Sequence, residues 1–199
     1  MESVELEFTG ERIVGKTLEE VAACCPPEGQ RHIDRYMWAK ERIRGEKILD
    51  CACGCGFGSF ILSESDKVGY VFGLDIDISA RDYAMQYYGN NSKTIFSQCD
   101  MLDLVHISSA HFDSIVSLES LEHVEDPTIV LNQFKRLLKP GGNIIASLPI
   151  IPTKHFNPYH KFEVRTFDEG RLFFDQNGFK IVDSWLQDEM FGIYELEVA

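Results

Sequence analysis

The segment from residue 47 to residue 58 has the residue types and the spacing of a ligand-binding loop. A short apolar run ends in Asp50, and glycines follow at positions 54, 56 and 58 before a helical pattern begins. Glycine lets the backbone turn tightly and approach a ligand, because it has no Cβ. A dinucleotide-binding loop would read Gly-x-Gly-x-x-Gly and would hold a diphosphate at a helix N-terminus. Here the third glycine comes one residue early, and Asp50 favours a ligand end with positive charge, since two anions in one cleft repel.

A second group with chemical potential follows the apolar run at 112–118. Glu119, Glu122 and His123 are spaced i, i+3 and i+4, which predicts that they share one face of a helical turn. Two carboxylates and an imidazole so close together would repel or have raised pKa values unless a cation joined them. The group is therefore a candidate for metal binding or for acid and base chemistry.

Three acids lie at or near the ends of apolar runs: Asp50, Asp75 and Asp100. In open α/β sheets, ligands bind beyond the carboxyl ends of the strands. Asp75 follows the glycine loop by about 20 residues, the position from which an acid accepts hydrogen bonds from both ribose hydroxyls. The alternative is that each acid is an ordinary helix N-cap or turn residue, as Asp commonly is.

These residues must be positioned by alternating strands and helices. Strands are expected at 47–52, 70–75, 94–99, 112–118 and 143–149, with helices between them clearest at 57–64, 79–88 and 128–138. Such alternation predicts a parallel sheet with helices on both faces.

Further elements flank the alternating region. Two helices are expected before it, at 18–24 and 30–44. After a loop at 149–165, Thr166 and Glu169 form a capping box that opens another helix, and strands are expected at 179–187 and 191–198. We therefore expect a single domain over residues 1–199, with a helical lid (1–45), a cofactor-binding core (46–148) and a closing region (149–199).

Composition and charge narrow the class of protein. With 44% hydrophobic and 26% charged residues the chain is typical of globular proteins. The 19 Lys and Arg against 32 Asp and Glu give a net charge of −13, which counts against bulk nucleic acid as a substrate because like charges repel. The chain has no apolar run of about 18 residues and no signal-peptide core, so we expect no membrane span and a cytoplasmic location.

Six cysteines raise the question of a metal or disulfide framework. Cys51, Cys53 and Cys55 alternate within the glycine loop, and Cys24 and Cys25 are adjacent. Neither spacing is the C-x2-C type of zinc sites. Small buried thiols in a reducing compartment are the favoured interpretation.

The glycine spacing and the acid before it together resemble the first motif of class I S-adenosylmethionine-dependent methyltransferases. Lys-Pro-Gly-Gly at 139–142, before the fifth expected strand, fits the same resemblance. The resemblance implies a Rossmann-like α/β fold, with a mostly parallel seven-stranded sheet, helices on both faces and an antiparallel last strand. A nicotinamide-binding fold is the rival interpretation, which predicts the same Asp75 but not the Gly-x-Gly-x-Gly spacing.

The resemblance also implies roles in binding S-adenosylmethionine. The glycine loop and Asp50 would bind the methionine end, Asp75 the ribose, and Asp100 with Met101 the adenine. Asp77 is a weaker candidate for the ribose. Arg35 or Tyr36 would reach the methionine carboxylate; the alternative is a surface arginine and a core tyrosine. The complete expected set is Asp50, Ala52, Gly54, Gly56, Gly58, Asp75, Ile76, Asp100, Met101, Ser117, Arg35 and Tyr36.

The Glu-x-x-Glu-His pattern is similar to the divalent-metal site of ubiquinone-pathway O-methyltransferases and of small-RNA 3′-terminal 2′-O-methyltransferases. In the second group a histidine downstream of the fifth strand completes the site. Here His160 occupies that region, and His155 is the second candidate for this ligand. This resemblance implies that Glu119, Glu122, His123 and His160 bind Mg²⁺ or Mn²⁺ and hold a vicinal diol or catechol. The alternative is a metal-free site, because Leu-Glu-His-Val also recurs in methyltransferases whose histidine lines the acceptor pocket or acts as a base.

Phe-Thr-Gly-Glu-Arg at 8–12 and His-x-x-Arg-Tyr at 32–36 resemble a bacterial and phage group linked to glycan assembly. This resemblance implies a hydroxyl on a sugar, glycan intermediate or similar polyol as the acceptor, bound and deprotonated by the residues of the Glu-x-x-Glu-His pattern and His160. Arg12 and Lys16 are candidates for contact with an anionic acceptor, although solvated charges are the simpler interpretation. The alternatives are an N-methyltransferase, a small-RNA-end methyltransferase, or a non-catalytic subunit that binds cofactor to stabilise a partner. The oligomeric state stays open.

Overall fold

Seven strands form one sheet: β1 (Lys47–Cys51), β2 (Tyr70–Asp75), β3 (Thr94–Gln98), β4 (Phe112–Ser117), β5 (Leu138–Pro149), β6 (Phe179–Gln187) and β7 (Phe191–Val198). The structure is a computed structural model that describes residues 5–6, 12–151 and 159–199. The strand order is β3-β2-β1-β4-β5-β7-β6. The first five strands pair in parallel, whereas β7 is antiparallel to both β5 and β6. This arrangement confirms the expected Rossmann-like fold with an antiparallel last strand.

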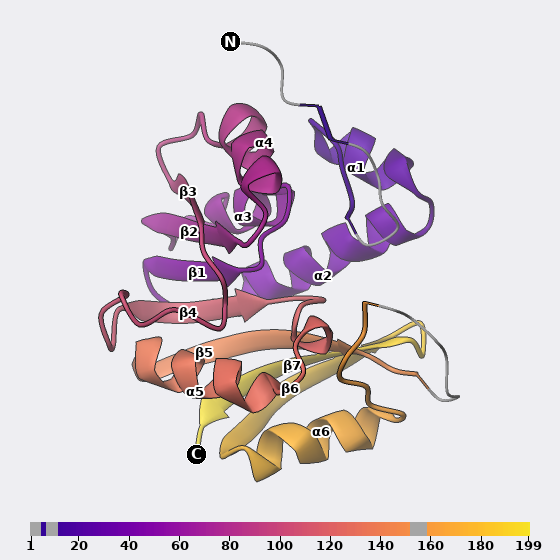
Figure 1. The fold of residues 1–199 in the computed structure, drawn as a ribbon, viewed down its shortest axis with the longest axis vertical. Coiled ribbons are helices and arrows are strands. Elements are labelled where there is room, and N and C mark those ends of the chain that lie inside the picture. Colours follow the sequence, from indigo (N-terminus) through magenta and orange to yellow (C-terminus); the bar gives the residue numbers. More distant parts are fainter. Residues whose placement is uncertain (1–4, 7–11, 152–158) are drawn as a thin grey trace.

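The helices of the described residues are α1 (Leu18–Cys24), α2 (Glu28–Arg42), α3 (Phe57–Ser63), α4 (Ile78–Tyr88), α5 (Pro127–Leu137) and α6 (Phe167–Gln176), with a short 3₁₀ helix, η1 (Leu121–His123). Side-chain caps define where several of them begin: Thr17 accepts from the backbone N of Glu20 at 3.3 Å, and Thr166 from that of Glu169 at 3.1 Å. Figure 1 shows α3 and α4 beside the half of the sheet that contains β1 to β3, and α5 and α6 beside the half that contains β5 and β6.

Two apolar cores lie on the two faces of the sheet, because neighbouring residues of a strand point to opposite sides. On β1, Ile48 packs with side chains from α1 to α4, and Leu49 packs with side chains from α5 and α6. The strand order reverses at β1, which pairs with β2 on one side and with β4 on the other. Ligand sites of open α/β sheets form beyond the carboxyl ends of the strands at this kind of switch point.

The element bounds differ from expectation by more than one residue at two places. The helix expected at 30–44 begins at Glu28 and ends at Arg42, since an acid is favourable in the first turn of a helix and a base in the last. The strand expected at 143–149 begins at Leu138, which already pairs with Phe112 of β4 before a shift in register. No helix within the described ranges has the length and apolar character needed to cross a bilayer.

Candidate active site

The glycine loop joins β1 to α3 and lies at the carboxyl edge of the sheet. The backbone N of Cys53 donates to Leu74 O at 2.8 Å, which holds the loop against the end of β2. Gly54 and Gly56 both have positive φ, 54° and 87°. A Cβ on Gly56 would lie 2.6 Å from Ala84 Cβ, whereas a Cβ on Gly54 would meet no atom within 4 Å. Gly56 therefore permits packing against α4, and Gly54 leaves space for a ligand.

Gly58 and Asp50 support the loop from behind. A Cβ on Gly58 would lie 2.0 Å from Tyr36 Cζ, so the tyrosine ring occupies the space that glycine leaves. The Tyr36 hydroxyl donates to Asp50 Oδ1 at 3.1 Å, and the Ser59 hydroxyl donates to Oδ2 at 2.6 Å. Burial raises the pKa of Asp50 to about 7, against these two hydrogen bonds, which lower it. Asp50 is fully buried, and Tyr36 stands between it and the cavity.

Asp75 ends β2 at the rim of the same loop. Its Oδ2 accepts from the backbone N of Gly54 at 2.8 Å, and its Oδ1 accepts from the backbone N of Asp77 at 2.9 Å. Burial raises the pKa of Asp75, against these two backbone hydrogen bonds, which lower it. Asp77 caps α4 by accepting from Ser79 N at 2.8 Å and forms an ion pair with Arg12. The loop thus fixes the orientation of the Asp75 carboxylate.

A cavity of about 400 Å³, here called the cofactor cavity, opens above the loop. Six residues of the expected cofactor set line it: Tyr36, Ala52, Gly54, Asp75, Ile76 and Met101. The sequence interpretation missed other lining residues, among them Ile13, His32 and Leu118. Arg12 also lines the cofactor cavity. The sequence had suggested it as a candidate for contact with an anionic acceptor. Nothing about Ile13 in the sequence marks it as a residue of the site, and His32 could have been identified only through its place in the His-x-x-Arg-Tyr motif.

Other residues of the expected set lie near this cavity without lining it. Asp100 accepts from the backbone N of Leu102 at 2.9 Å and so stabilises a turn. Ser117 is buried, with its hydroxyl 2.6 Å from that of Ser120. Arg35 is neither a surface arginine nor a lining residue: it is fully buried, and its Nη1 donates to Gln187 Oε1 at 2.6 Å. Gly56 permits the loop to pack against α4, and Gly58 and Asp50 lie behind the loop, as described above.

A second cavity of about 300 Å³, here called the acceptor chamber, adjoins the first. Its polar lining residues are Glu28, His32, Glu119, Glu122, His123 and His160, and apolar residues such as Pro149 and Phe191 complete it. Ile13, His32, Glu119 and His123 line both cavities. These four residues are called the doorway below.

Glu119 does not share a helical turn with Glu122 and His123, as was expected. η1 contains only Leu121–His123, and Glu119 lies before it with φ 49°. Ser147 explains the difference, because its hydroxyl accepts from Glu119 N at 2.7 Å and donates to Glu119 Oε1 at 2.6 Å. The serine therefore fixes both the backbone and the carboxylate of Glu119 at the doorway.

His123 is oriented by a backbone carbonyl. Its Nδ1 lies 3.0 Å from Tyr159 O, and a carbonyl oxygen can only accept, so Nδ1 carries a proton and, in the neutral imidazole, Nε2 is the acceptor nitrogen. Glu122 Oε1 lies 4.0 Å from that Nε2, and the His160 ring centroid lies 5.6 Å from that of His123. The structure thus brings Glu122, His123 and His160 together, as the sequence suggested.

The arrangement does not fit the expected metal site. Within the part of the chain that the structure describes, no three or more His, Cys, Asp or Glu side chains are placed to hold a metal ion. The Glu119 carboxylate is instead held by Ser147. His155, the reserve ligand, lies outside the described residues.

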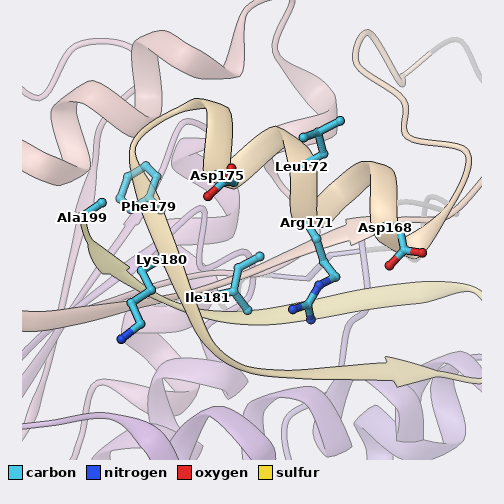
Figure 2. Close-up of a pocket in the computed structure, with 8 residues that line it drawn as sticks. All are labelled: Asp168, Arg171, Leu172, Asp175, Phe179, Lys180, Ile181 and Ala199. Carbon is cyan, nitrogen blue, oxygen red and sulfur yellow. The ribbon is translucent and has the colours of Figure 1, made fainter.

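A third cavity, of about 490 Å³, lies between α6 and the beginning of β6. Figure 2 shows Asp168, Arg171 and Asp175 projecting from α6, with Lys180 and Ile181 on the strand below them. Lys180 and Ile181 are at the amino end of β6, which runs parallel to the first five strands. These two residues place the cavity toward the opposite edge of the sheet from the glycine loop, and we do not assign it to the active site.

Comparison with known proteins agrees with this geometry. Residues 49–146 match a family described as a methyltransferase domain. Among curated proteins, the chain is 27% identical over 166 residues to phosphoethanolamine N-methyltransferase 1 of Triticum aestivum, covering 78% of this chain and 32% of that protein. It is 30% identical over 113 residues to the ubiquinone biosynthesis O-methyltransferase of Coxiella burnetii, covering 57% and 47%. The chain thus spans less than half the length of these two relatives.

Solved structures share the fold at low sequence identity. A methyltransferase in complex with the Haloferax volcanii Trm112 methyltransferase activator gives a TM-score of 0.71 at 18% identity, covering 93% of this chain and 99% of that one. An S-adenosylmethionine-dependent methyltransferase of Aquifex aeolicus gives 0.70 at 16% identity, covering 92% and 99%. Magnesium protoporphyrin IX methyltransferase of Synechocystis, solved with S-adenosylhomocysteine, gives 0.63 at 19% identity, covering 84% and 82%. Residues 49–146 thus match the methyltransferase-domain family, and the described residues have the Rossmann-like fold of solved S-adenosylmethionine-dependent methyltransferases.

Proposed function

We propose that the chain transfers the methyl group of S-adenosylmethionine to a hydroxyl of a sugar, glycan intermediate or similar small polyol. The observation that carries the proposal is the doorway, where the cofactor cavity and the acceptor chamber share four lining residues. Methyl transfer from a sulfonium is an in-line displacement, so the donor and the acceptor must meet at one point. Two adjoining cavities with a common wall meet this requirement.

In this proposal the cofactor cavity binds S-adenosylmethionine through the residues that the motif suggested. Asp75 accepts hydrogen bonds from the ribose hydroxyls, which is compatible with its two backbone donors because each carboxylate oxygen has two lone pairs. Met101 packs on the adenine, and Gly54 leaves space for the methionine portion. When bound, the cofactor supplies an electrophilic methyl group at the doorway.

His123 acts as the general base in this proposal. Its Nδ1 is held by Tyr159 O, so Nε2 is the nitrogen that accepts the proton of the acceptor hydroxyl. Glu122, with Oε1 4.0 Å from Nε2, stabilises the imidazolium that then forms. A nearby carboxylate favours the charged form of a histidine, because opposite charges attract.

Metal assistance by Mg²⁺ or Mn²⁺ is a separate hypothesis, which the Glu-x-x-Glu-His pattern motivates and the arrangement of the described side chains does not support. Chelation separates the two routes. Turnover that persists after EDTA treatment supports His123 as the base, and turnover lost to EDTA and restored by Mg²⁺ or Mn²⁺ supports the metal route.

A screen for release of S-adenosylhomocysteine tests the proposed reaction. Purified protein is incubated with S-adenosylmethionine and sugars, polyols, catechols or amines, with and without Mg²⁺. We expect product with hydroxyl acceptors and less with amines of similar size. Calorimetry that detects no binding of either S-adenosylmethionine or S-adenosylhomocysteine would refute the proposal.

N-methylation is a second candidate, and the acid-rich chamber favours it. Glu28, Glu119 and Glu122 line the chamber and would attract a protonated amine, and one relative is a phosphoethanolamine N-methyltransferase. Turnover confined to amines in the same screen would select this reaction. A small RNA end is a weaker candidate, given the net charge of −13.

A partner-dependent role is a further alternative, because the Haloferax volcanii neighbour was solved with an activator protein. Copurification with a larger protein, together with no product from the isolated chain, would favour it.

A further inference from the structure

We propose that Glu119 recognises the positive charge of the sulfonium at the doorway, so that the site holds S-adenosylmethionine more strongly than it would without this carboxylate. The neutral product, S-adenosylhomocysteine, would gain nothing from it. The inference rests on the proposed function, because it requires the cofactor in the cofactor cavity. Glu119 would thus distinguish the charged S-adenosylmethionine from the neutral S-adenosylhomocysteine, in place of the metal-binding role suggested by the sequence.

The position of Glu119 supports this role. It follows the carboxyl end of β4 and is one of the four residues that line both cavities. The transferable methyl group must be at the doorway to reach an acceptor in the chamber, and the sulfur that carries it must be close by. Glu119 is the one acidic residue among the four doorway residues.

The backbone of Glu119 is held in an unusual conformation by its surroundings. A non-glycine residue with φ 49° is energetically unfavourable and persists only where the surroundings hold it. Ser147, which is fully buried on β5, provides this restraint through its hydrogen bonds to Glu119 N and Oε1. A carboxylate fixed in this way is preorganised for a cation and needs no rearrangement when the ligand arrives.

The other charges near the doorway leave this role to Glu119. Burial lowers the pKa of His32 well below its usual range, and the nearby Arg35 lowers it further, so His32 is neutral. Arg12, the cation that lines the cofactor cavity, is paired with Asp77 at the ribose side. Asp75 is held at the same side by backbone amides. Ile13 is uncharged.

The reaction would remove the attraction as it proceeds. The acceptor oxygen forms a bond to the methyl carbon, the carbon–sulfur bond breaks, and its electron pair stays on sulfur. The sulfonium becomes a neutral thioether, and the hydroxyl proton passes to His123. Glu119 then no longer attracts the spent cofactor, which favours its release.

Calorimetry with both forms of the cofactor tests the proposal without knowledge of the acceptor. The dissociation constants of S-adenosylmethionine and S-adenosylhomocysteine are measured for the wild type, Glu119→Gln and the control Glu28→Gln. For Glu119→Gln we expect S-adenosylmethionine to bind about tenfold more weakly, ~1.4 kcal/mol, with S-adenosylhomocysteine affinity unchanged within about twofold. Glu28 lines the chamber but not the cofactor cavity, so its variant should keep the wild-type ratio.

The outcomes are distinguishable. Equal weakening of both ligands in Glu119→Gln would mean that the residue shapes the cavity, and unchanged affinities would mean that it does nothing there; either result overturns the inference. If the wild type binds neither ligand, the proposed function fails instead. Ser147→Ala provides a second variant should Glu119→Gln not fold: a smaller but still selective loss for S-adenosylmethionine supports the inference, and an unchanged ratio overturns it.

Discussion

Replacing Asp50 by Asn should change how the stability of the protein depends on pH. Asp50 is fully buried beneath the glycine loop, and burial raises its pKa from 3.8 to about 7. The folded protein therefore holds a proton on Asp50 at pH values where the unfolded chain has released it. The stability that this proton provides is fully present below pH 3.8 and is lost as the pH rises through about 7.

The size of the effect follows from the difference between the two pKa values. A rise from 3.8 to about 7 corresponds to about 4 kcal/mol over the whole titration, at 1.36 kcal/mol per pKa unit. Between pH 5 and pH 8, the wild type should lose about 2.5 kcal/mol of unfolding free energy relative to Asp50→Asn. The constant cost of fitting an amide between Ser59 and Tyr36 cancels in this comparison.

Urea unfolding of both proteins at pH 5, 6, 7 and 8 provides the measurement. Other titrating groups contribute to both proteins, so the difference between the two free energies isolates Asp50. If this difference stays constant within about 0.5 kcal/mol across the range, Asp50 does not have the raised pKa that its burial requires, and the reasoning is refuted.

Three further predictions concern the loop, the base and a helix cap. Gly56→Ala should lower the free energy of unfolding by about 2–3 kcal/mol, because Gly56 has a positive φ and an added Cβ would clash with Ala84. Gly54→Ala also has a positive φ but no clash, so in urea unfolding it should lose less stability, while calorimetry should show weaker binding of S-adenosylhomocysteine. Equal losses of unfolding free energy in the two variants would contradict this. His123→Gln should lower turnover by about 10²-fold or more, with S-adenosylhomocysteine affinity kept, and full turnover would remove it as the base. Thr166→Ala should lower the free energy of unfolding, measured in urea, by about 1 kcal/mol, because it removes the side-chain cap of α6. An unchanged free energy would show that the cap contributes nothing to stability.

Much of the fold could be predicted because its signals are local. Apolar runs, caps and turn residues placed most strands and helices within two residues of their bounds, and β6 and β7 matched at both ends. The glycine loop was predicted for the same reason, since its positive φ values demand a residue type that is visible in the sequence. Asp75 was found because it follows a strand at a recognisable distance from that loop.

The parts of the site that were missed depend on contacts between distant segments. His32 and Ile13 reach the doorway because the N-terminal elements pack across the carboxyl edge of the sheet, and no local pattern encodes that packing. Glu119 was assigned to a helical turn because its spacing fits one, but a hydroxyl from β5 holds it in the left-handed region instead. Arg35 was expected at the cofactor or on the surface, and its buried bond to Gln187 joins residues far apart in the chain.

The insertion of β7 between β5 and β6 has a consequence for how the protein is assembled during translation. In the sheet as described, β6 forms hydrogen bonds with β7 and with no other strand, yet it is made first. When β6 leaves the ribosome its only partner strand, β7, has not yet been made, and in the finished sheet the edge of β5 pairs with β7 and not with β6. The closing hairpin must therefore add to the preceding strands as a unit, and a ribosome stalled before β7 would leave β6 exposed to chaperones or to aggregation.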